Sequence, residues 1–212
     1  GQQAGAQSAP EEQKKGGSLR IGAAGAGSAD TLEAHAVPQG VAFRARGQAL
    51  YETLFRRKPN YEAEGALADT AEPNDAGDQW TVRLKDGMEW HNGKSIGADD
   101  VVFSVERMLE LEAPGAARLK ALTIKRMKKV DPLTVRFELE RPNGLLRDFF
   151  MPEIMAIVPV GYDPKKPIGS GAFKLDSFTP GQESAFSRFE NYHDGPAFLD
   201  EVRVVNYDAD SA

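Results

Sequence analysis

The clearest hydrophobic pattern in the chain is an alternation over residues 79–85. The apolar face carries Trp80, Val82 and Leu84, and the polar face carries Thr81, Arg83 and Lys85. A period of two is typical of a strand with one buried face. The pattern therefore predicts a half-buried strand whose two basic side chains face solvent.

Two turn dipeptides follow this strand. Asp86-Gly87 and Asn92-Gly93 are typical of turns, because glycine adopts positive φ easily and Asp or Asn side chains bond the nearby backbone. The run between them, residues 88–91, contains Met88 and Trp90 and predicts a short second strand with its tryptophan buried.

Helical spacing begins after the second turn. Between residues 98 and 111, Val101, Val105 and Met108 lie on one stripe of a helix. Two aspartates fall in the first turn, where the helix dipole favours acidic side chains. We therefore expect an amphipathic helix that packs on the preceding strand.

Shorter patterns fill the rest of the chain. Strand-like runs lie at residues 19–24, 122–130, 133–140, 154–160, 172–178, 183–189 and 201–207, a helical spacing lies at 43–55, and 142–151 predicts a short helix or loop. Asp131-Pro132 and Pro180-Gly181 mark turns between neighbouring strands.

Composition narrows the classes of protein that these elements can form. The chain has 212 residues, of which 41% are hydrophobic, and a formal net charge of −6. The length and the hydrophobic content are enough for a core in one or two domains. The negative net charge argues against a nucleic-acid partner. The basic run at residues 125–129 is interpreted as the solvated face of a strand. The sequence contains no cysteine and no apolar run near the ~18 residues of a membrane span.

Two ordered blocks stand out. The first consists of Leu67-Ala68-Asp69, residues 80–85, Asp86-Gly87, Trp90-His91-Asn92-Gly93 and Ala98-Asp99-Asp100-Val101-Val102-Phe103. The second consists of Pro167-Ile168-Gly169-Ser170-Gly171-Ala172-Phe173, followed by Asn191-Tyr192 and a Gly-Pro pair. In order and separation they resemble the extracellular solute-binding proteins of family 5, which are the peptide, oligopeptide and nickel binding proteins of ABC importers. The resemblance covers the chain from about Ser18 to its end.

The resemblance implies a fold and a domain plan. The fold would be α/β, of the two-lobed, class II-like periplasmic-binding-protein type, with only the N-terminal lobe and its extra subdomain present. Residues 1–18 would be a disordered tether, 19–45 the first segment of lobe I, 46–167 an inserted subdomain, and 168–212 the return into lobe I. The chain would then stop before the second lobe, as the N-terminal portion of a longer protein.

The resemblance also implies a function. The protein would capture a peptide or similar small polar solute outside the cell and deliver it to the permease, without cofactor, metal or enzymatic activity. We expect an extracytoplasmic monomer, in the periplasm or on the outer face of the cell membrane, whose parent is held to the membrane by a lipid on an upstream cysteine. The alternative is a truncated relative that serves as a structural or interaction module and binds no solute.

The predicted ligand contacts lie at two strand ends. They are Ser28, Asp30, Thr31 and His35 at one end and Ser170 and Gly171 at the other. The loop over residues 22–28 is interpreted equally well as a tight turn that needs small residues. Because some relatives bind metal chelates, His35 could contribute to such a ligand. The paired glycines around Ser170 indicate a close backbone approach or a bend.

Other kinds of site were tested against the residues and fail. A dinucleotide fingerprint needs glycine where Ala24 stands and an acid that residues 41–47 lack. A nucleophile elbow around Ser170 needs glycine where Ile168 stands. The histidines lack metal-ligand spacing, and His91 is interpreted as a hydrogen-bonding structural residue. Nothing assembles a nucleophile, base and orienter, so we expect a binding protein.

Overall fold

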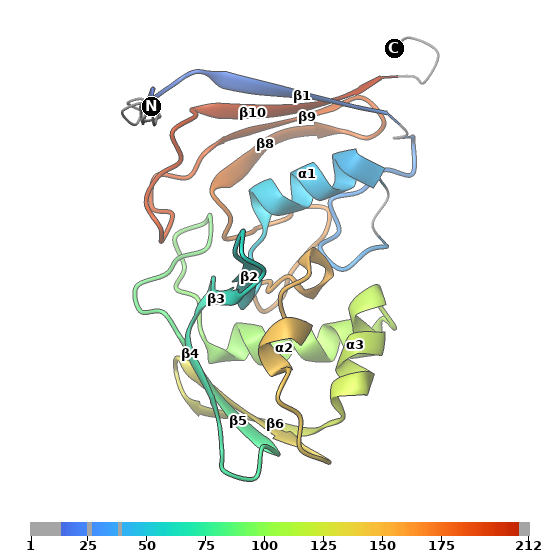
Figure 1. Cartoon of the computed structure of the whole chain (residues 1–212). Coiled ribbons are helices and arrows are strands. Elements are labelled where there is room, and N and C mark those ends of the chain that lie inside the picture. Colours follow the sequence, from blue (N-terminus) through green and yellow to red (C-terminus); the bar gives the residue numbers. More distant parts are fainter. Residues whose placement is uncertain (1–13, 25–26, 38–39, 208–212) are drawn as a thin grey trace, which may run out of the picture.

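The computed structural model describes residues 14–24, 27–37 and 40–207, which form two four-stranded sheets and one two-stranded sheet (Figure 1). The first sheet has the order β1-β10-β9-β8. Its strands are β1 Ser18–Ala24, β8 Phe173–Thr179, β9 Glu183–Arg188 and β10 Glu201–Tyr207. β1 runs parallel to β10, and the other neighbouring strands are antiparallel. The first and last strands of the described chain therefore lie side by side.

One helix covers a face of this sheet. α1 spans Gly40–Leu50, and Figure 1 shows it against one face of the sheet. Ala49 and Leu50 of α1 pack with Phe186 and Val204 from the central strands. Burial of large apolar side chains such as Leu50 and Phe186 contributes roughly 1.5–3 kcal/mol each, so this contact fixes the helix on the sheet.

The second sheet has the order β4-β5-β7-β6 and is antiparallel. Its strands are β4 Ala68–Pro73, β5 Gln79–Leu84, β6 Ile124–Asp131 and β7 Thr134–Leu139. Two helices accompany it, α2 Ala98–Glu110 and α3 Pro114–Leu122. Trp80, Val82 and Leu84 of β5 are buried with Val101 and Met108 of α2, so the apolar face of the strand meets the apolar stripe of the helix.

Short elements connect the two sheets. β2 Phe55–Arg57 and β3 Ala63–Gly65 form a hairpin, α4 spans Leu146–Phe149, and a 3₁₀ turn spans Glu153–Met155. A single bridge joins Glu52 to Ile157. Ala156 and Val158, which follow the 3₁₀ turn, belong to the core under the first sheet. The connecting segments therefore contribute to the packing of both sheets.

Many of the predicted elements are confirmed. The strand at 79–85 is β5, the helix at 98–111 is α2, and the late strands at 172–178, 183–189 and 201–207 are β8, β9 and β10. Both predicted turn glycines have positive φ, +72° at Gly87 and +78° at Gly93. Trp80 and Trp90 are buried, as their patterns predict.

Some local predictions are wrong. Residues 88–91 form no strand, because their pairing is limited to one bridge between Glu89 and Ser95. The helix predicted for 43–55 is α1 and ends at Leu50, because Glu52 pairs with Ile157 and β2 begins at Phe55. The strand predicted for 154–160 is replaced by the 3₁₀ turn and that same single bridge.

Other departures come from contacts between distant segments. Lys85, expected in solvent, is half-buried and pairs with Asp194 at 3.3 Å. Helix α3 and strands β2 to β4 were not predicted, since their apolar spacing is short or broken by small residues.

The predicted domain boundaries stay a prediction. The boundary between residues 45 and 46 lies inside α1. Most of the tether predicted for residues 1–18 lies outside the described residues. Within the described part, Gly16 and Gly17 already bond to the later chain, with the Gly17 amide 2.9 Å from the Asp200 carboxylate.

Candidate functional site

A recess of about 600 Å³ opens where the end of α1 meets the β2–β3 hairpin and the segment before and through the 3₁₀ turn. Its lining is polar as well as apolar. The lining residues are Gly47, Gln48, Tyr51, Glu52, Thr53, Arg56, Arg57, Ala66, Met151, Pro152, Glu153, Ala156 and Tyr192. We call this the α1 recess. Pockets of this size accommodate small ligands, so it is a candidate binding site.

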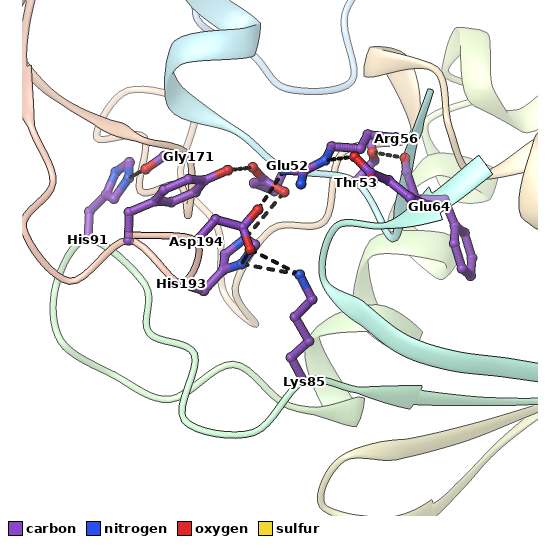
Figure 2. A network of polar contacts seen from close by, with 11 residues as sticks. Glu52, Thr53, Arg56, Glu64, Lys85, His91, Gly171, His193 and Asp194 are labelled. Carbon is purple, nitrogen blue, oxygen red and sulfur yellow. Dashed lines mark hydrogen bonds and ion pairs between the residues drawn. The ribbon is translucent and has the colours of Figure 1, made fainter. Parts of the chain in front are cut away.

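The local chain path explains why charged side chains gather there. After α1 ends at Leu50 the chain becomes extended, and Glu52 bridges to Ile157 before β2 begins. Alternation along β2 then buries Phe55 and brings Arg56 into the polar network of Figure 2. Tyr192 reaches the same place from the loop after β9.

Glu52 is the centre of one half of that network. The Tyr192 hydroxyl donates a hydrogen bond to Oε1 of Glu52, and Nε2 of His193 lies 3.5 Å from Oε2. Burial, reinforced by the neighbouring Glu52 carboxylate, raises the pKa of Tyr192 far above its ordinary value. The tyrosine therefore stays a hydrogen-bond donor at every physiological pH.

Asp194 is the centre of the other half. Its carboxylate lies 2.6 Å from Nη1 of Arg56 and 3.3 Å from Nζ of Lys85, while Nε of Arg56 lies 2.7 Å from Glu64 (Figure 2). Partial burial opposes ionisation of Asp194, but the hydrogen bond from Arg56 and the positive charges of Lys85 and Arg56 together outweigh the effect of burial and lower the pKa of Asp194. The network thus joins the loop after β9 to the hairpin and to the end of β5.

A second polar cluster joins Glu33 and His35, in the loop after β1, to Arg107 of α2. Both terminal nitrogens of Arg107 lie 2.8 Å from the Glu33 carboxylate, and Nη1 also lies 2.8 Å from Nδ1 of His35. Since arginine only donates, Nδ1 accepts, and Nε2 carries the proton that it donates to the Ala156 carbonyl at 2.9 Å. Burial, together with the cationic Arg107, lowers the pKa of His35. His35 is therefore held neutral in one tautomer.

The first group of predicted contacts, residues 28–35, is partly accessible. Ser28 is exposed in a turn, and Thr31 is half-buried and lines a narrow recess against α1. Asp30 is buried and forms an ion pair with Arg46, which also donates to Ser184 at 2.9 Å. His35 is buried in the cluster described above.

The second group, Ser170 and Gly171, is buried beneath the end of α1. A Cβ added to Gly169 would lie 1.7 Å from the Leu50 carbonyl oxygen, and one added to Gly171 would lie 2.4 Å from that of Ala49. The close backbone approach predicted for these glycines is confirmed. The Ser170 hydroxyl has no hydrogen-bond partner within the described part of the chain.

Neither the α1 recess nor the narrow recess at Thr31 is lined by residues of both groups. Each group instead contacts the same helix, Asp30 through Arg46 and Gly171 through its amide, which donates to the Leu50 carbonyl at 3.0 Å. Glu52, Arg56 and Tyr192 were not predicted as site residues. Tyr192 stands in the second sequence block, so its place in that block was the one available signal.

The predicted structural role of His91 is confirmed. Its Nε2 lies 2.9 Å from the Gly171 carbonyl oxygen, and its amide donates to the Gly169 carbonyl at 2.9 Å. Within the part of the chain that the structure describes, no group of three or more His, Cys, Asp or Glu is arranged to hold a metal ion. Among the same residues, no helix has the length and apolar character needed to cross a bilayer.

Comparison with known proteins agrees with this architecture. A family model described as "Bacterial extracellular solute-binding proteins, family 5 Middle" matches residues 62–212. The oligopeptide-binding protein AppA of Bacillus subtilis is 29% identical over 166 residues, which are 72% of this chain and 31% of AppA.

Two solved structures extend the likeness to the fold. The ABC transporter substrate-binding protein CtaP of Listeria monocytogenes matches with a TM-score of 0.76 and 28% identity over 93% of this chain and 42% of its own. The periplasmic binding protein DppA of Helicobacter pylori, in complex with the peptide STSA, matches with a TM-score of 0.79 and 25% identity over 92% of this chain and 43% of its own. The predicted α/β fold of periplasmic-binding-protein type is confirmed. The chain spans less than half the length of these relatives.

Proposed function

Because the chain belongs to the bacterial extracellular solute-binding proteins of family 5, we propose that it is part of the substrate-binding component of an ABC importer. This component captures a peptide or a similar small polar solute outside the cell and passes it to the permease. The observation that carries the proposal is the likeness to DppA of Helicobacter pylori, whose structure contains a peptide.

The α1 recess supports the polar character of the solute. Its lining includes the carboxylates of Glu52 and Glu153 and the guanidinium groups of Arg56 and Arg57. Such groups bind the charged and amide parts of a peptide through charge-assisted hydrogen bonds, each worth about 1.5–3 kcal/mol. An apolar solute would leave them desolvated and unpaired, at a cost.

The predicted contacts stay proposals within this function. Ser28 and Thr31 are accessible enough to touch a solute directly. Asp30, His35, Ser170 and Gly171 are buried, and we assign them the support of the segments that present the accessible groups.

Affinity in a two-lobed binder comes from closing the second lobe over the ligand. One lobe supplies part of the contacts but still immobilises the solute, at an entropic cost of several kcal/mol. Loss of three charge-assisted hydrogen bonds would weaken a micromolar site beyond the millimolar range, on the order of 4.5 kcal/mol or more. This 212-residue chain alone should therefore bind peptides negligibly.

The experiment is isothermal calorimetry on the 212-residue chain and on the intact protein, with one peptide library. We expect micromolar or tighter binding by the intact protein and negligible heat from the chain alone. Equal affinities would place the site wholly within these residues and end the two-lobe mechanism. Failure of both to bind any peptide would favour the alternative of an interaction module.

The remaining parts of the proposal concern place and assembly. We propose that the protein acts outside the cytoplasm as a monomer and that its parent is held at the membrane by a lipid. Light scattering of the intact protein tests whether it is a monomer, and mass spectrometry of its natural N-terminus tests whether it carries a lipid.

A further inference from the structure

The tip of the β2–β3 hairpin contains a strained and exposed aromatic residue. Tyr61 has φ of +69° and is 76% exposed. The turn is closed by backbone hydrogen bonds from Tyr61 to Lys58 and from Lys58 to Glu62, each 2.9 Å. A bulky residue with positive φ is rare, because its Cβ crowds the backbone, and glycine or asparagine would fit the turn with less strain. Stability of the hairpin therefore does not explain a tyrosine at this position.

The side chain of Tyr61 stacks with Arg57 on β2. The Arg57 guanidinium lies over the Tyr61 ring, 5.9 Å from its centroid. A cation held on an aromatic face keeps its hydrogen-bonding edge free and loses part of its rotamer freedom. Arg57 also lines the α1 recess, so the pair stands at the rim of the candidate site.

The charges of the recess leave this guanidinium without a counter-ion. Arg56 is held by Glu64 and Asp194, Glu153 lies 3.3 Å from Arg44, and Glu52 accepts from Tyr192. Within the part of the chain that the structure describes, neither an ion pair nor a hydrogen bond is found for the side chain of Arg57. Of the four charged groups in the wall, it is therefore the one available to a ligand anion.

We propose that Arg57 recognises a free carboxylate on the solute, and that the α1 recess selects short peptides with an unblocked carboxyl end. The planar guanidinium presents two parallel donors that match the two oxygens of a carboxylate. Tyr61 positions this fork by holding it on its ring. The inference rests on the proposed function, because it names the class of solute that the same protein captures.

The test uses the intact protein and two matched libraries of tri- to pentapeptides, one with free carboxyl ends and one with C-terminal amides. Bound peptides are identified by mass spectrometry, and the affinities of matched pairs are measured by calorimetry. We expect the free acids to bind at least about tenfold tighter than the amides. Arg57→Gln should remove this preference, and Arg57→Lys should retain part of it.

Two further variants separate recognition from folding. Arg83→Gln removes an exposed arginine from β5 in the other sheet and should leave the preference intact. Tyr61→Gly relieves the positive φ, so it should raise the melting temperature and yet reduce the preference for free acids. A residue with a purely structural role would not shift these two readouts in opposite directions.

The outcomes distinguish this inference from the proposed function. Equal binding of acids and amides, or a preference that survives Arg57→Gln, would overturn the role of Arg57 and leave peptide capture standing. Absence of binding from both libraries would overturn peptide capture and this inference together.

Discussion

Nε2 of His91 lies 2.9 Å from the carbonyl oxygen of Gly171, which joins the turn after β5 to the segment beneath α1. The two residues belong to the two separate sequence blocks and are 80 positions apart. Phe189 packs edge-on against the imidazole, with ring centroids 4.9 Å apart. The contact makes His91 a link between the two halves of the described fold.

This link should make stability depend on pH. Burial lowers the pKa of His91 from 6.5 to about 4. As pH falls below 6.5 the unfolded chain takes up the proton first, so the free energy of unfolding decreases between pH 6.5 and about 4, by up to about 1.4 kcal/mol per unit. Urea unfolding across that range should show it.

His91→Gln is the matched control for the pH effect. Glutamine can place an amide donor near the Gly171 carbonyl and does not titrate, so its unfolding free energy should fall less steeply with acid. His35, whose pKa is also lowered by burial, contributes equally in both proteins and cancels from the difference. Identical slopes would show that the proton on His91 does not govern stability.

Gly171→Ala should destabilise the protein by about 1–3 kcal/mol or more, because the new methyl group meets the backbone of α1 rather than a movable side chain. Gly144→Ala is the control, since a Cβ there meets nothing within 4 Å. Thermal unfolding of both variants measures the difference. A melting temperature for Gly171→Ala like that of the control would mean that α1 shifts easily.

Arg46→Met should cost about 3–5 kcal/mol, because it leaves the Asp30 carboxylate buried without its cation. Adding Asp30→Asn removes the stranded charge and should recover part of the loss. Arg20→Met, at an exposed position of β1, is the control. Chemical denaturation measures the free energy of unfolding of the two single variants and the double variant. A double variant no more stable than Arg46→Met would contradict the role of the ion pair.

Trp80→Ala should cost about 3–5 kcal/mol, since it empties a core position and leaves the Asn143 carbonyl without the indole donor at 2.9 Å. Arg83→Ala, on the opposite face of the same strand, should change stability little. Differential scanning calorimetry of the two variants tests the register of β5. Similar losses in both would mean that the strand is placed wrongly.

The sequence allowed prediction of elements whose pattern is local. β5 and α2 each bury one face against the other, so the sequence of β5 alternates between apolar and polar residues and that of α2 has its apolar residues at helical spacing. Residues 88–91 have strand-like composition but find one pairing bridge, at Glu89, and a strand exists only where a partner strand runs beside it. α1 ends at Leu50 because of a bridge to a segment about 100 positions later, which spacing within the helix cannot reveal.

The candidate site was less predictable for the same reason. Tyr192 and Glu52 are 140 positions apart, and Arg56 and Asp194 are 138 apart. Nothing in a single sequence marks such partners. The predicted residues 28–35 lie beside a strand end, as expected. The partner of Asp30 is Arg46 of α1, and the apolar spacing that predicts this helix does not mark a buried arginine.

The parallel pairing of β1 with β10 sets the order in which the chain can complete its fold. Ser18 is in register with Glu201, so β1 has no partner strand until about 180 more residues have been made. At a synthesis rate of 5–20 residues per second, that delay is roughly 10–40 s. The segment carrying the second sheet is continuous and can fold during the wait, whereas β1 must remain unpaired. Any holding factor that the nascent protein needs should therefore act on β1, and its release should coincide with the emergence of β10.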